Sequence, residues 1–88
     1  MFFELAWDDQ NEAHIARHDV VPREVEEVCG SRPLLYRQGR ENTRYVFGRT
    51  HAGRYLFVVL TESMDGRWYI VTARDMTHAE QREFRRRT

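Results

Sequence analysis

The sequence predicts a single α+β domain: two N-terminal helices, then an antiparallel β-meander of three to four strands, then a C-terminal helix. Helical spacing of apolar residues ends near residue 30, two-residue alternation fills residues 34–73, and a capping box opens the last segment. Because helices and strands are segregated along the chain, an α+β arrangement is favoured over alternating βα units. Eighty-eight residues, 41% of them hydrophobic, are enough for one domain over 1–88 and exclude two.

The first 30 residues are expected to form two helices. Asp8 is a suitable N-cap, and apolar and polar residues at three- and four-residue spacing predict a helix over about 9–18. Pro22 is placed as the first residue of the second helix, Val25 belongs to its buried stripe, and Gly30 ends it. With these helices on one side, we expect the other face of the sheet to stay open.

The middle of the chain is expected to form the meander. Its strands are predicted at Leu34–Tyr36, Thr43–Thr50, Tyr55–Glu62 and Trp68–Ala73. Tight turns containing glycine separate the last three strands. The run Tyr55–Leu60 is apolar at every position, which is typical of a central strand buried on both faces.

The last helix is expected to begin after Thr77. Thr77 and Glu80 have the spacing of a capping box, and the helix continues through Phe84 into three arginines. Such an arginine-rich end is either a solvated helix terminus or a site for phosphate.

The charges are balanced in number but separated along the chain. Residues 1–30 carry eight acids and two arginines, a charge of −6, whereas residues 31–88 carry twelve arginines and six acids, a charge of +6. All fourteen basic residues are arginine, which is explained by codon bias or by recognition of phosphate or carboxylate. The separation indicates either an acidic partner surface or matching of the two halves to each other.

Several classes of protein are excluded. The longest apolar run has six residues, against roughly 18 for a membrane span, so no bilayer crossing is expected. The N-terminus has no basic region before an apolar stretch, so we expect a cytoplasmic protein. The single Cys29 makes neither an internal disulfide nor a cysteine cluster for zinc, and no cofactor is expected.

Arginine and aromatic residues alternate along the predicted strands. They are Arg37, Arg40, Arg44, Arg49 and Arg54, with Tyr36, Tyr45, Phe47 and Tyr55. On an open sheet this pattern is typical of single-stranded RNA binding, with phosphates on guanidinium groups and bases on rings. The alternative is a solvated face with the rings in the core. Arg74 shares strand parity with Trp68 and Ile70 and is expected to emerge at the sheet end beside Arg49.

Of the four histidines, His18 is the candidate for proton transfer because it lies at the predicted end of the first helix beside Arg17. His14 stands four residues earlier, which is also the spacing of a zinc-binding pair. No third ligand accompanies the pair in a recognisable motif, so no metal site is expected.

Seven segments follow one another along the chain: Trp7-Asp8, Ile15–Val20, Pro22–Val28, Gly48–Thr50, Gly53–Val59, Val71–Arg74 and Met76–Glu80. Taken in this order, they resemble the BrnT family, the toxin half of a type II toxin–antitoxin pair. The resemblance covers about residues 7 to 87.

The resemblance implies a RelE-like fold and a metal-independent ribonuclease that inhibits translation. It also implies a cognate antitoxin as partner, RNA as substrate, and contact with operator DNA only through the antitoxin. The catalytic residues it implies are His18, Arg49, Arg54 and Arg74. The candidate substrate-binding residues are Arg17, Arg44, Tyr45 and Tyr55.

Two other functions compete with the ribonuclease. A non-catalytic protein-binding module would use an open sheet edge at Leu34–Tyr36 or Trp68–Ala73. An inactive, diverged toxin is the other form of this alternative, because Asp19 stands where the family commonly has Gly. A metal-dependent hydrolase using His14 and His18 is the second competitor.

Overall fold

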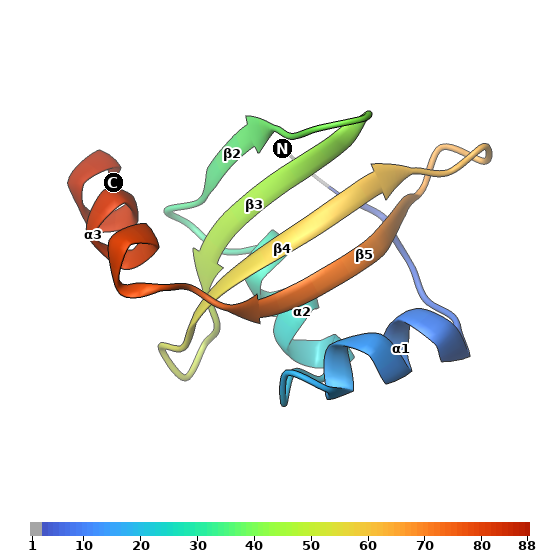
Figure 1. The fold of residues 1–88 in the computed structure, drawn as a ribbon, viewed down its shortest axis with the longest axis horizontal. Helices are drawn as coiled ribbons and strands as arrows, with labels where there is room; N and C mark the ends of the chain where they lie inside the picture. Colours follow the sequence, from blue (N-terminus) through green and yellow to red (C-terminus); the bar gives the residue numbers. More distant parts are fainter. Residues whose placement is uncertain (1–2) are drawn as a thin grey trace.

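The computed structural model describes residues 3–88 and has an α+β fold, as predicted. Its elements are β1 (Leu5–Ala6), α1 (Asp9–Ala16), α2 (Pro22–Cys29), β2 (Leu35–Gln38), β3 (Thr43–Arg49), β4 (Tyr55–Glu62), β5 (Trp68–Asp75) and α3 (His78–Arg87). They form one five-stranded sheet in the order β1-β5-β4-β3-β2 (Figure 1). The predicted antiparallel meander is β2 to β5.

The N-terminal part of the chain differs from the sequence analysis in two features. β1 pairs in parallel with the start of β5, so this edge is partly covered and β2 is the exposed edge of the meander. A strand of two residues is too short to show alternation, which explains why it was missed. α1 ends at Ala16, two residues before the predicted end, and Asp19 takes a φ of 58° in the turn that follows.

The helix caps follow the sequence. The Asp8 side chain accepts from the Asn11 backbone N–H, and the Asn11 side chain accepts in return from the Asp8 N–H. Thr77 and Glu80 form the same reciprocal pair at the start of α3. Val21 has no capping side chain, and Glu24 instead accepts from the Val21 N–H at 3.2 Å.

The sheet separates two hydrophobic clusters. On one face, α1 and α2 cover alternate residues of β3, β4 and β5: Val46, Leu56, Val58, Leu60, Ile70 and Ala73. On the other face, Phe47, Phe57 and Val59 pack with Met76 and with Phe84 of α3. β4 is therefore buried on both faces, as predicted for a central strand. The expectation that this second face stays fully open is wrong, because α3 folds back over one end of it.

Candidate functional site

The second face of the sheet has a floor of aromatic rings, which lies partly under α3. Tyr45 and Phe47 come from β3, and Tyr55 and Phe57 come from β4. The ring centroids of Phe47 and Phe57 are 4.8 Å apart, and those of Tyr45 and Phe57 are 5.2 Å apart. Alternate residues of paired strands point to the same side, so the four rings form one continuous surface. We call this surface, with the arginines upon it, the open face.

Four arginine side chains lie over these rings. The guanidinium carbons are 4.5 to 5.7 Å from the ring centroids in the pairs Arg37–Phe47, Arg49–Tyr55, Arg74–Phe57 and Arg85–Tyr55. A cation is attracted to the negative face of an aromatic ring, and this attraction holds each guanidinium against the sheet. A groove of about 330 Å³ lies between three of these rings, those of Tyr45, Phe47 and Phe57, and the acids Glu80 and Glu83 of α3.

Arg49 and Arg85 carry positive charge that no carboxylate of residues 3–88 neutralises through an ion pair. They flank a single phenol, that of Tyr55, and Arg85 Nη1 reaches the Tyr55 hydroxyl at 3.5 Å. The Arg85 hydrogen bond, with the charge of Arg49, lowers the pKa of Tyr55. An electropositive spot with free N–H donors is therefore available to an anion.

Gly53 helps to place Arg49. Its φ of 95° lies in the left-handed region that favours glycine. A Cβ at this position would lie 2.9 Å from the Arg49 Nη2 atom, and Arg49 Nε donates to the Gly53 carbonyl at 3.2 Å. The turn between β3 and β4 thus favours glycine for its backbone, and a side chain there would displace the Arg49 guanidinium.

Arg74 reaches the open face because of a β-bulge. The β4–β5 register shifts between Val59 and Leu60, which leaves Val71 without a partner. Ala73 consequently faces the helices and is fully buried, whereas Arg74 lies over Phe57 on the opposite face. The parity expected with Trp68 and Ile70 is therefore wrong for Arg74, since one extra residue reverses which side a side chain faces.

Arg74 also joins the sheet to α3. Its Nη1 and Nη2 atoms donate to the two carboxylate oxygens of Glu80 at 2.8 and 3.0 Å. This two-point contact holds the pKa of Glu80 below its ordinary value, with further help from the Thr77 N–H. Arg74 is thus a charged group whose position is fixed from both sides.

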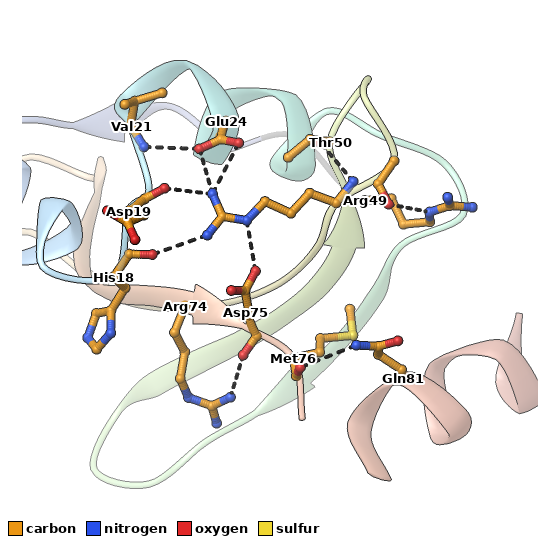
Figure 2. A network of polar contacts seen from close by, with 12 residues as sticks. His18, Asp19, Val21, Glu24, Arg49, Thr50, Arg74, Asp75, Met76 and Gln81 are labelled. Atoms are coloured by element: carbon orange, nitrogen blue, oxygen red, sulfur yellow. Dashed lines mark hydrogen bonds and ion pairs between the residues drawn. The ribbon is translucent and has the colours of Figure 1, made fainter. Parts of the chain in front are cut away.

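Arg54 donates to a network of acceptors, of which Figure 2 labels His18, Asp19, Glu24 and Asp75. Its Nε donates to Asp75 Oδ1 at 2.7 Å, and its Nη1 donates to Glu24 Oε1 at 3.0 Å. Two backbone carbonyls complete the shell, Asp19 at 2.7 Å and His18 at 3.1 Å. The hydrogen bond to Asp75 is the main cause of a raised Arg54 pKa. The guanidinium is therefore occupied by protein groups, unlike that of Arg49.

His18 stands in the turn after α1, and Arg54 binds its backbone carbonyl. Figure 2 shows the imidazole directed away from that carbonyl. The charge of His18 contributes to the lowered pKa of Asp75, so imidazole and carboxylate are near one another. His14 packs beside it, with ring centroids 6.0 Å apart.

The remaining expected residues divide between the two faces. Tyr45 and Tyr55 are on the open face, where Tyr45 packs against Phe57 and Tyr55 lies under Arg49. Arg44 is one residue from Tyr45 and therefore faces the other side, where its guanidinium lies over Trp68 at 5.7 Å. Arg17 caps α1 and lines a hollow between α1 and β5.

The sequence analysis treats Arg85 only as one of the arginines at the end of the last helix and does not separate it from its neighbours. The signal available was its position next to Phe84, the only large apolar residue of the last helix and the one that anchors α3 beside Tyr55. Because Phe84 packs beside Tyr55, the next residue, Arg85, also lies close to the sheet.

Other kinds of site are not built by the described residues. Across residues 3–88 no three His, Cys, Asp or Glu side chains gather in a way that would hold a metal ion. None of the helices in this range is long and apolar enough to cross a membrane. Burial, with the nearby charge of Glu26, raises the pKa of Cys29 to about 12, so its thiol stays protonated and is a poor nucleophile.

A sequence model described as the ribonuclease toxin, BrnT, of type II toxin–antitoxin systems matches residues 7–80. The chain belongs to the BrnT family. The match includes both N-terminal helices, the whole meander and the capping box of α3. As a toxin of a type II system, a BrnT protein implies an antitoxin as its partner. No curated protein matches the chain.

The hydrogen-bond network around Arg54 predicts that replacing Arg54 destabilises this BrnT chain more than replacing Arg49 does. Arg54→Ala is expected to lower the free energy of unfolding by about 2 kcal/mol, because several hydrogen bonds to a charged group are lost. Arg49→Ala, which removes no ion pair, is expected to change it by about 0.5 kcal/mol or less. Urea denaturation of both variants measures the difference, and equal midpoints would contradict this role for Arg54.

The lowered pKa of Asp75 predicts that the free energy of unfolding depends on pH. Its pKa is below the ordinary 3.8, mainly through the Arg54 hydrogen bond, so its contribution is present above that value and is lost as the pH falls through the lower folded pKa. Asp75→Asn is therefore expected to be less stable than the wild type at pH 7, with the gap closing below about pH 4. Urea titrations across this range test it, and a gap that does not depend on pH would show that the charge of Asp75 contributes nothing.

Proposed function

We propose that this BrnT protein is an endoribonuclease that cleaves single-stranded RNA on the open face. The observation that carries the proposal is the pair Arg49 and Arg85, held on the ring of Tyr55 without a carboxylate partner. Guanidinium groups bind phosphate through two N–H donors, and neighbouring aromatic rings accept bases. The family description as ribonuclease toxin supports the same function.

The proposed reaction is attack of a ribose 2′-hydroxyl on the adjacent phosphorus. A bond forms between the 2′-oxygen and phosphorus while the bond to the 5′-oxygen breaks, which leaves a 2′,3′-cyclic phosphate. Negative charge grows on the phosphoryl oxygens in the transition state, and we propose that Arg49 and Arg85 stabilise it. Arg74, whose N–H edge is bound by Glu80, is proposed to hold α3 against the sheet. Arginine stays protonated, so it does not serve as the base.

His18 is the proposed proton-transfer group, so the RNA strand on the open face has to reach the end of β5, where the His18 imidazole lies near Asp75. Imidazole can take the proton of the 2′-hydroxyl and return one to the departing 5′-oxygen near neutral pH. Arg54 supports this role by holding the His18 carbonyl, while its Nε binds Asp75 at the end of β5. We therefore assign Arg54 to positioning. Tyr55 is proposed to contact the same phosphate as its two arginines.

The proposed chemistry draws its charge stabilisation from arginine and needs no metal. We propose that RNA cleavage inhibits translation in the cytoplasm, that the cognate antitoxin neutralises it, and that operator DNA is contacted through the antitoxin alone. The toxin–antitoxin description of the family supports these assignments.

Substitution of the two unpaired arginines tests the proposal. Arg49→Ala and Arg85→Ala are each expected to lower the rate of RNA cleavage by about 10²-fold, the typical cost of removing one transition-state donor. Cleavage of a single-stranded RNA by purified protein in excess EDTA measures the rate. Growth and RNA integrity after induced expression without antitoxin give a second readout.

Arg67→Ala is the matched control. Arg67 is an exposed arginine at the turn between β4 and β5, the opposite end of β4 from Tyr55, and it pairs with Asp65. This variant is expected to cleave like the wild type. If folded wild-type protein left RNA intact and growth normal, a non-catalytic binding module or an inactive toxin would replace the ribonuclease. Activity that disappeared in EDTA would contradict metal independence.

A further inference from the structure

We propose a second phosphate-binding subsite beside the turn between β3 and β4, which takes the neighbouring phosphodiester of the same RNA strand. This inference rests on the proposed function in so far as its ligand is RNA. The subsite is a hollow of about 500 Å³ whose chemistry comes from Arg32, Arg49 and His51, with Ser31 and Gly53 at its wall. We call it the turn pocket.

The turn pocket is lined by basic and neutral side chains, with no carboxylate among its lining residues. Arg32 forms no ion pair within residues 3–88, and the contact it makes is to the Ser31 carbonyl at 2.7 Å. In a chain whose acids equal its arginines, a hollow that gathers unpaired arginines favours an anion.

The position of His51 is fixed from outside the turn pocket. Its backbone N–H donates to Glu27 Oε1 at 3.0 Å, and its Nδ1 lies 3.4 Å from the other carboxylate oxygen. This leaves Nε2 on the opposite side of the ring, free for a ligand. Glu27 thus anchors the histidine without itself lining the hollow.

Arg49 connects the turn pocket to the open face. Its guanidinium lies over Tyr55 and also borders the hollow, where Gly53 gives it room to fold back. A strand bound on the open face and leaving past the β3–β4 turn would therefore place one phosphate on each side of Arg49. This continuity favours a polynucleotide over a free anion as the ligand. It also predicts preference for RNA that extends beyond the cleaved bond, without preference for its sequence.

Salt-dependent binding tests the subsite. The probe is a 2′-O-methyl oligoribonucleotide of ten residues, which lacks the attacking hydroxyl and stays intact. Fluorescence anisotropy gives its affinity for the wild type, for the double variant Arg32→Ala/His51→Ala and for the control Arg67→Ala over a range of salt. Each phosphate contact on a single strand contributes about 0.7 to the slope of log affinity against log salt. The double variant is expected to lose affinity and at least one such increment, and the control to lose neither.

An unchanged slope in the double variant, or no binding by the folded wild type, would overturn the turn pocket as an RNA subsite. If the slope fell but the wild type cleaved no RNA, the subsite would stand and the ribonuclease proposal would fail. An NMR titration with inorganic phosphate distinguishes an RNA phosphodiester from a free phosphate ion as the ligand of the turn pocket. Saturation of the Ser31 and His51 amide signals by phosphate, with no response to the decamer, would overturn the RNA assignment in favour of a free anion.

Discussion

The guanidinium of Arg54 joins three segments that are far apart in the sequence. It binds the turn after α1 through two carbonyls, α2 through Glu24, and the end of β5 through Asp75. Charge-assisted hydrogen bonds of this kind are directional, so they fix how the helical layer meets the end of the sheet. The placement of His18 relative to β5 depends on this contact, as does the point from which the chain enters α3.

Four arginines of this BrnT protein divide into two kinds by their partners. Arg54 and Arg74 are bound by carboxylates and connect helices to the sheet. Arg49 and Arg85 are held by the ring of Tyr55, which fixes their position without cancelling their charge. A stacked guanidinium keeps its N–H edges free, whereas an ion-paired one has used them. This difference, more than the number of arginines, is the reason we propose the open face as the place for an anion.

Much of the fold could be predicted from local signals. Asp8 and Thr77 cap their helices, and glycine-containing turns separate the strands where expected. The bulge at Val71 could not be predicted, because an unpaired residue looks like any other in a strand, yet it decides which face Arg74 occupies. Arg49 and Arg54 were equivalent candidates in sequence. Their difference comes from Glu24 and Asp75, carboxylates more than 20 residues away that only the tertiary fold brings to Arg54.

The chemical end left on cleaved RNA tests the central claim most directly. Purified protein in EDTA would be given an oligoribonucleotide and its 2′-O-methyl counterpart, with mass spectrometry of the products. Attack by the 2′-hydroxyl predicts cleavage of the first with a 2′,3′-cyclic phosphate end and no cleavage of the second. Cleavage of both substrates with 3′-hydroxyl ends, or of neither by folded protein, would contradict an arginine-based ribonuclease site on the open face.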